Sequence, residues 1–358
     1  MRRVVRHQVW WRFTILRWAI LVWVVLVSAC GCSSERPKAP AAWVEDEVTF
    51  VADGLTIYGT YRHRADSPPG PAALLISESG NTDRNGDNAV AGKIGTLRAI
   101  AGLLSDRGVA SLRYDKAGTG RTGLGPYASR PSDVGSAVYT AGAKAAVRFL
   151  AGQAGTDPNR ISVYGHGEGA THALMLATDT SPGAPKIGSL GLLQPLAGRY
   201  LDLITNRVRA DVDAQVNARS ITPQHADDVV SAWTAAVAQA RSGGTVPARL
   251  PNGLGAILNP GNVKAVIESD AINPVALAML VPNGTPVLLT CSDSDGQARC
   301  DAVQPMAAAL AHPQLDFVAL KGVSHVLKDD PTDSITNYAK DQPLSQEFVG
   351  ALDGFLNH

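Results

Sequence analysis

Apolar, strand-like runs alternate with helical stretches along most of this chain, and this alternation restricts its fold most strongly. Parallel strands need crossover connections, so the pattern predicts an α/β fold with a mostly parallel sheet and helices on both faces. Strands are expected at 47–52, 55–62, 72–77, 109–114, 161–164, 187–193, 286–290 and 315–320. Helices are expected at 94–107, 132–155, 169–178, 301–311 and from 345 onward, with Ser132 as an N-cap.

The alternation stops between residues 195 and 285, where the sequence is helical in character and interrupted by proline and glycine. This segment is interpreted as a helical cap inserted into the α/β unit. The expected core therefore comprises residues 45–194 and 286–358, and its first two strands form a hairpin about Asp53 and Gly54.

The N-terminus has the organisation of an export signal. Residues 1–29 carry five arginines and no acidic residue, and they end in a 12-residue apolar run, 18–29. That run fits the apolar region of a signal peptide and is short for a membrane span. Val27-Ser28-Ala29-Cys30 resembles a bacterial lipobox, so Cys30 is the expected lipidation site, with palmitate as one acyl group, and 30–44 a tether. An uncleaved anchor helix is the alternative.

This reading predicts a protein attached to the extracytoplasmic face of the cell membrane through its N-terminal lipid. Without residues 1–29 the chain has 27 basic and 32 acidic residues, which gives no electrostatic basis for nucleic-acid binding. Cys291 and Cys300 lie nine residues apart, a spacing that permits a disulfide in an oxidising compartment. No zinc-binding pattern accompanies them, and neither metal nor cofactor is expected.

A glycine-rich turn joins the expected strand at 161–164 to the helix at 169–178. It reads Gly165-His166-Gly167-Glu168-Gly169. A nucleophile elbow has this strand–turn–helix context, with the pattern G-x-S-x-G and the nucleophile at its apex. Here the apex residue is Gly167, which has no side chain.

Two later loops carry residue types that would complete a catalytic triad. Asp293 and Asp295 follow the strand at 286–290, and His325 follows the strand at 315–320. A carboxylate can orient a histidine that acts as general base. The order of elbow, acid and histidine along the chain is that of α/β-hydrolases.

Four segments together resemble bacterial α/β-hydrolases of the serine aminopeptidase and dienelactone hydrolase type. They are 75–88, 112–120, the elbow and the His325 loop, compared with the family patterns GSGxxDRxGxN, LRYDxRGxGxS, GHSxG and a late histidine. The resemblance covers about residues 45–358 and implies the α/β-hydrolase fold. It favours Asp295 over Asp293 as the triad acid, because Asp295-Gly296-Gln297 matches the family's D-x-Q pattern.

The resemblance also implies an oxyanion hole formed by backbone N–H groups. The expected donors are Glu168 and either Ser79 or Gly80. Arg113 and Asp115 are expected to fix their loop and not to take part in catalysis.

The chain departs from the family pattern at three positions: Gly167 replaces the serine, Glu78 replaces the first glycine of the GSG turn, and Ala117 replaces an arginine. Without a serine Oγ no acyl-enzyme can form at the elbow. We therefore expect a catalytically impaired, esterase-like protein of the cell envelope.

Two hypotheses follow for its role. One is a pseudoenzyme of the cell envelope that binds either a ligand, such as a small ester-like or acyl molecule, or a partner in the pocket under the cap. The other is a weak ester hydrolase in which water fills the space of the missing Oγ and is activated by His325 and Asp295. Three serines near the expected site could substitute for the nucleophile, although none is on an elbow: Ser79, Ser292 and Ser324.

Glycine spacing also raises a dinucleotide-binding alternative, because 165–170 and 118–123 fit G-x-G-x-x-G/A. That fingerprint needs an acidic residue about 20 residues later, at the end of the next strand. The first copy has none, and Pro126 and Pro131 interrupt the helix that the second copy would need. The hydrolase interpretation is therefore preferred.

Overall fold

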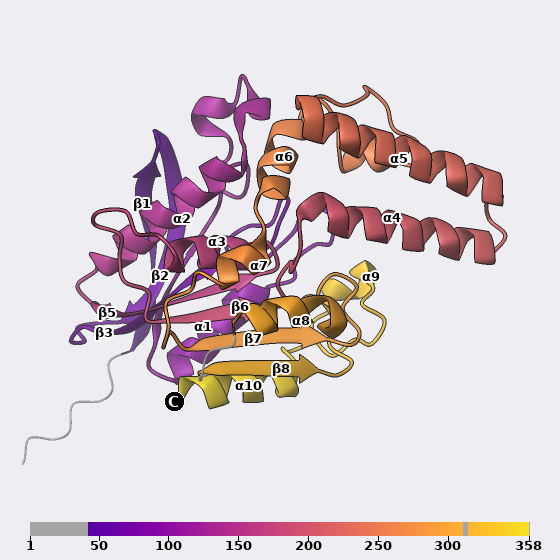
Figure 1. The fold of residues 1–358 in the computed structure, drawn as a ribbon. Helices are drawn as coiled ribbons and strands as arrows, with labels where there is room; N and C mark the ends of the chain where they lie inside the picture. Colours follow the sequence, from indigo (N-terminus) through magenta and orange to yellow (C-terminus); the bar gives the residue numbers. More distant parts are fainter. Residues whose placement is uncertain (1–41, 311–313, 358) are drawn as a thin grey trace, which may run out of the picture. The chain divides into compact units, whose positions relative to one another are not determined.

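The computed structural model describes residues 42–310 and 314–357, which form one α/β unit around an eight-stranded sheet (Figure 1). The predicted signal peptide, Cys30 and most of the tether lie outside these residues. The strand order is β1-β2-β4-β3-β5-β6-β7-β8. The strands are β1 Trp43–Ala52, β2 Leu55–Arg64, β3 Gly70–Ile76, β4 Ala110–Tyr114, β5 Thr156–His166, β6 Ser189–Leu193, β7 Val287–Ser292 and β8 Leu315–Leu320.

The sheet is mostly parallel, as the alternation predicted. Only β1 with β2, and β2 with β4, pair antiparallel. The opening hairpin pairs Ala52 with Leu55. Asp53 and Gly54 between them both have positive φ, at 47° and 79°, as a two-residue hairpin turn requires.

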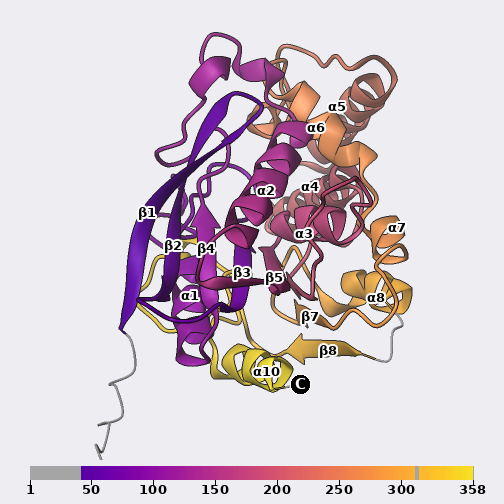
Figure 2. The ribbon, with the colours of Figure 1, turned by 90° about the vertical axis from the view of Figure 1, so that its left-hand side faces the viewer.

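Helices cover both faces of the sheet because its inner strands are apolar on both sides. In β3, Leu74 packs into the core beneath α2 and α3, and the next residue, Leu75, packs into the core beneath α1 and α10 (Figure 2). The helices are α1 Thr96–Asp106, α2 Ser136–Ala151, α3 Gly169–Ala177, α4 Tyr200–Asn217, α5 Pro223–Gly243, α6 Val263–Ala271, α7 Pro274–Ala278, α8 Cys300–Ala309, α9 Ile335–Tyr338 and α10 Gln346–Leu356. Short 3-10 turns occur at Gly125–Tyr127, Pro131–Asp133 and Leu254–Ala256.

The start of α2 differs from its prediction. Ser132 lies in a 3-10 turn, and Gly135 is the N-cap of α2, without a side-chain cap. A remote residue determines this start: Glu268 of α6 accepts a 3.0 Å hydrogen bond from the Ala137 N–H. An acidic group at a helix N-terminus stabilises the unpaired N–H groups there. The prediction was wrong because the capping group comes from another part of the chain.

The long helices α4 and α5 run side by side away from the sheet and pack with α6 around the buried Trp233 (Figure 1). Asp270 of α6 ties the three together, because its buried carboxylate accepts bonds from Arg199, Arg241 and the Leu201 N–H. Within the described residues, no helix has both the length and the apolar character needed to span a membrane.

Candidate functional site

The turn after β5 has the geometry of a nucleophile elbow. Gly167 has φ +55°, and its N–H donates to the Leu193 carbonyl at 3.0 Å, which anchors the turn to the end of β6. Left-handed backbone costs a residue with a Cβ roughly 1–2 kcal/mol. A Cβ on the preceding Gly165 would overlap the backbone of Gly169, so this position too must be small.

The carboxylate of Glu78 lies directly over Gly167. A Cβ added at residue 167 would overlap Oε2 and Cδ of Glu78. Glu78 follows β3, which pairs with β5 so that Ile76 is opposite Gly165. The ends of parallel neighbouring strands meet at one sheet edge, and this brings the glutamate to the elbow. A side chain of the same protein therefore fills the space that a side chain at residue 167 would occupy.

The N–H groups predicted as oxyanion donors bind this carboxylate. The Ser79 N–H donates to Glu78 Oε1 at 2.6 Å. The Glu168 N–H lies 3.4 Å from Oε1 and 3.3 Å from Oε2. Among the described residues, Gly80 makes no hydrogen bond to Glu78, so Ser79 is the donor from that loop. The donors are therefore present and are occupied by a negative group.

His325 connects Glu78 to Asp295. Its Nε2 is 3.0 Å from Glu78 Oε2, and its Nδ1 is 2.8 Å from Asp295 Oδ2. Asp295 is fully buried and its other oxygen accepts from the N–H groups of Gln297 and Ala298, at 2.6 and 3.0 Å. Asp293 instead accepts from the Gly322 N–H at 2.8 Å. The structure thus brings His325 together with Asp295 and not with Asp293.

The side chains of Glu78, His325 and Asp295 form a row of hydrogen-bonded ionisable groups. Burial favours the neutral form of Glu78, but the hydrogen bond and the charge of His325 outweigh it and hold the pKa of Glu78 far below its usual range. Burial also opposes the charge of His325, but Asp295 and Glu78 raise its pKa well above the usual value. The pKa of Asp295 is lowered, since the charge of His325 outweighs its burial. These directions favour an imidazolium at His325 between two carboxylates.

Two further residues that the sequence did not single out fix the arrangement. Lys116 is buried and its Nζ donates to the Glu78 carbonyl and, at 3.0 Å, to the Thr82 carbonyl. His166 Nε2 lies 2.7 Å from the carbonyl of His325. Ligand atoms of Glu78, His166 and His325 lie within 4.8 Å of one another, a spacing that a metal ion could bridge. One feature of the sequence could have indicated this arrangement: Glu78 is a large residue at a position where the family pattern has glycine.

The serines considered as substitutes have other contacts. Ser292 Oγ donates to the Val323 carbonyl at 2.6 Å, and Ser324 Oγ donates to the Lys328 carbonyl at 3.0 Å. Both are fully buried. Ser79 contributes its backbone N–H to Glu78. Among the described residues, no serine hydroxyl is hydrogen-bonded to the imidazole of His325.

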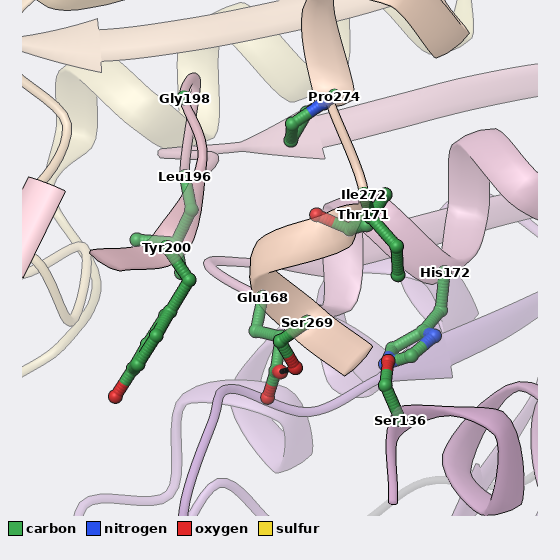
Figure 3. A pocket seen from close by; sticks show the side chains of 10 residues that line it. All are labelled: Ser136, Glu168, Thr171, His172, Leu196, Gly198, Tyr200, Ser269, Ile272 and Pro274. Atoms are coloured by element: carbon green, nitrogen blue, oxygen red, sulfur yellow. Dashed lines mark hydrogen bonds between the residues drawn. The ribbon is translucent and has the colours of Figure 1, made fainter. Parts of the chain in front are cut away.

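The side chain of Glu168 lines a small pocket beside the helical insertion (Figure 3). Ser269 of α6 donates to it at 3.2 Å, and burial raises its pKa against the opposing charge of Lys116. Tyr200 at the start of α4 and His172 of α3 also line the pocket, together with the apolar Leu196, Ile272 and Pro274. The pocket therefore combines apolar walls with the half-buried carboxylate of Glu168, the residue after Gly167.

A disulfide joins Cys291 at the end of β7 to Cys300 at the start of α8. The loop that it closes contains Asp295. The covalent link restricts the segment that holds the carboxylate against His325.

The arginine and aspartate of the 112–120 segment are structural, as expected: Asp115 accepts from the N–H and guanidinium of Arg84, and Arg113 donates to Asn85 and Glu45.

The sequence matches no protein-family model. An uncharacterized protein of Mycobacterium tuberculosis, present in strains CDC 1551 / Oshkosh and ATCC 25618 / H37Rv, is 33% identical over 139 residues. These residues are 39% of this chain and 43% of that protein, so the chain spans less than half the length of the curated relatives that it matches.

Solved structures of hydrolases share the fold. An esterase of Pyrococcus furiosus superposes with a TM-score of 0.53 at 14% identity, over 88% of this chain and 91% of the esterase. The α/β hydrolase GrgF from Penicillium sp. sh18 gives 0.55 at 16% identity, over 88% and 98%. The chain therefore has the α/β-hydrolase fold that the sequence predicted. Identities this low establish the fold alone.

Proposed function

We propose that this protein is an exported, lipid-anchored α/β-hydrolase-like protein that does not hydrolyse carboxylic esters by the serine mechanism. Its role, as we propose it, is to bind a small ester-like or acyl ligand under the helical insertion. The observation that carries the proposal is the Glu78 carboxylate, which takes up both the nucleophile position at Gly167 and the N–H groups of Ser79 and Glu168.

Acyl transfer through a serine needs an Oγ and free oxyanion donors. Gly167 supplies no Oγ, and a carboxylate on the donors repels the negative oxygen of a tetrahedral intermediate. Removing one oxyanion donor typically costs about 10²–10³ in kcat. A site with both donors occupied by a negative charge, and with no nucleophile at the apex, is therefore severely impaired in this reaction.

The proposed location rests on different features. The lipobox-like sequence ends at Cys30, and the Cys291–Cys300 disulfide is of a kind that persists in oxidising compartments. Expression of the full chain in a bacterium with lipoprotein processing, followed by membrane fractionation and palmitate labelling, tests this part. We expect label and membrane attachment to be lost in Cys30→Ser. Retained attachment of that variant would contradict a lipid anchor.

The catalytic part is tested with p-nitrophenyl acetate and a fluorophosphonate probe. The wild type is expected to show neither turnover nor labelling. Gly167→Ser alone should also stay unlabelled, because the serine side chain and the Glu78 carboxylate compete for the same volume. Gly167→Ser combined with Glu78→Gly should be labelled, since the combination restores the family pattern at both positions. This double variant is the positive control for an intact fold.

The competing hypothesis is ester hydrolysis by water that His325 activates. Its supporting feature is the His325–Asp295 pair at 2.8 Å. Wild-type turnover of p-nitrophenyl acetate that disappears in His325→Ala would establish this alternative and overturn the proposal.

A further inference from the structure

One carboxylate and two imidazoles meet at the sheet edge beside Gly167. Glu78 follows β3, His166 is the last residue of β5, and His325 lies in the loop after β8. A candidate ligand atom from each of the three lies within 4.8 Å of the other two. Both histidines are buried, and their ring centroids are 4.9 Å apart. Because the three side chains come from distant parts of the chain, no metal-binding motif marks them in the sequence.

Hydrogen bonds to other groups leave one nitrogen of each imidazole for a metal ion. Asp295 lies 2.8 Å from His325 Nδ1 and keeps a proton there, so Nε2 is the nitrogen that can bind the ion. His166 Nε2 lies 2.7 Å from the His325 carbonyl, which only accepts, so Nε2 carries the proton. No described residue forms a hydrogen bond with His166 Nδ1. Metal-binding histidines typically donate their second N–H to a carboxylate or a backbone carbonyl in this way.

The carboxylate of Glu78 is oriented by its own hydrogen bonds. The Ser79 N–H holds Oε1 at 2.6 Å, and Oε2 faces His325 Nε2 at 3.0 Å. Two ligands of one tetrahedral zinc ion lie about 3.4 Å apart, since each bond is 2.0–2.2 Å long. An ion can therefore replace the proton between Oε2 and Nε2 after a small outward shift of Glu78, without a cavity of its own. The Glu78 side chain is 14% exposed, against 3% for His325, so this shift is toward the accessible side.

The charges around the three side chains suit a divalent ion. Imidazoles bind metals in their neutral form, so the balancing charge must come from carboxylates. Glu78 supplies one negative charge in contact with the ion, and Asp295 supplies a second one behind His325. Lys116 is bonded to the backbone carbonyl of Glu78 and not, among the described residues, to its carboxylate. Two positive charges on the ion are thus balanced by two carboxylates.

We propose that Glu78, His166 and His325 form a binding site for a divalent transition-metal ion, and that this ion is zinc. Imidazole ligands suit zinc, whereas Ca²⁺ and Mg²⁺ prefer oxygen ligands. Three protein ligands leave a fourth position for water or for an oxygen atom of a bound molecule. The inference goes beyond the proposed function and does not depend on it, because a metal ion at Glu78 leaves Gly167 without a nucleophile.

Metal titration of the wild type is the first test. The full chain in detergent micelles is treated with EDTA, dialysed, and titrated with Zn²⁺ against a fluorescent indicator and with Co²⁺ by visible absorption. We expect one ion per chain, micromolar or tighter affinity, and the intense absorption of four-coordinate Co²⁺. Absence of Zn²⁺ uptake at micromolar concentrations would overturn the inference. Displacement of zinc by equimolar Mg²⁺ or Ca²⁺ would contradict the imidazole ligands.

Variants locate the ion. Glu78→Gln, His166→Gln and His325→Gln each remove one ligand and should weaken zinc binding at least tenfold, whereas loss of an outer hydrogen bond in Asp295→Asn should weaken it by about 10–100-fold. His63→Gln should bind zinc like the wild type, because His63 is a histidine of β2 with a carboxylate partner of its own at 2.9 Å. Zinc binding that survives in all three ligand variants is adventitious surface binding and overturns the inference. Unchanged binding in His166→Gln alone excludes the three-residue site, since the pairing of Glu78 with His325 does not need His166.

Thermal unfolding shows whether each variant is folded. Zinc should raise the melting temperature of the wild type and of His63→Gln but not that of the ligand variants, since an ion that binds only the folded state stabilises it. Ester assays and histidine titrations are carried out in EDTA, so their outcomes are independent of this inference. Absence of zinc binding leaves the impaired serine site as proposed. Ester turnover in EDTA contradicts the proposed function whether or not zinc binds.

Discussion

The Glu78 carboxylate and Gly167 are complementary: the glutamate fills the volume that a side chain at residue 167 would need. Glu78 follows β3 and Gly167 follows β5, and these two strands are adjacent in the sheet. Both residues differ in size from the residues of the hydrolase pattern that the sequence resembles: residue 167 is smaller and residue 78 is larger. The two departures are thus one structural change, in which the group beside His325 comes from a different loop.

We predict that Gly167→Ala destabilises the protein beyond the strain of its backbone. The new methyl group must displace the Glu78 carboxylate from His325, at ~1–3 kcal/mol for overpacking, in addition to the left-handed backbone. Urea unfolding measures the loss. Gly284→Ala is the matched control, because Gly284 has φ +81° and open space around it. Equal losses in the two variants would contradict the overlap.

We predict that Glu78 helps to keep His325 protonated, so Glu78→Gln should lower the pKa of His325. The folded-state pKa of His325 lies above its ordinary 6.5, so this group stabilises the fold below pH 6.5 and loses that contribution as the pH rises through the folded value. In Glu78→Gln this loss should be smaller and should be complete at a lower pH. Histidine NMR titration and urea unfolding against pH measure both effects.

The control for that titration is Asp293→Asn, since Asp293 binds the Gly322 N–H and not His325. An unchanged His325 titration in Glu78→Gln would refute the pairing. Comparison with the spectrum of His325→Gln assigns the resonance.

Lys116→Met is predicted to destabilise the loop that carries Glu78. The carbonyls of Glu78 and Thr82 lose their buried donor, at ~1–3 kcal/mol for each unpaired group. Burial lowers the pKa of Lys116 from 10.5 to about 8. Between these values the unfolded chain binds the extra proton, so the wild type should gain stability with rising pH relative to the variant.

Unfolding free energies of both proteins at several pH values test this prediction. Lys144→Met is the control, because Lys144 pairs with Asp179 near the surface at 3.1 Å. A loss in Lys116→Met no larger than in Lys144→Met would argue against the anchoring role.

Replacing both Cys291 and Cys300 by serine should lower the melting temperature and loosen Asp295. The disulfide restricts a short loop, and its loss costs about 2–3 kcal/mol. Since Asp295 supports the raised pKa of His325, that pKa should fall as well. Reductant should lower the melting temperature of the wild type and leave the variant unaffected; a reductant effect on the variant would point to another cause.

Much of the fold was predictable because it depends on the local periodicity of apolar residues along the chain. Continuous apolar runs such as β3 identified buried parallel strands, and the spacing of Leu97, Ile100 and Leu104 identified α1. The order of elbow, acid and histidine predicted which loops meet. Side-chain contacts between distant segments were not predictable in this way, as the cap of α2 by Glu268 illustrates.

By itself the sequence determined the α/β alternation, the hairpin at the start, the glycine at the apex of the turn at 165–169 and the candidates Asp295 and His325. Tertiary structure alone decided what occupies the space over Gly167. Glu78 and Gly167 are far apart in the chain and become neighbours only because β3 pairs with β5 in this register. Whether a side chain fills a space depends on the strand register and on the hydrogen bonds that orient the carboxylate, and neither is encoded in local sequence patterns.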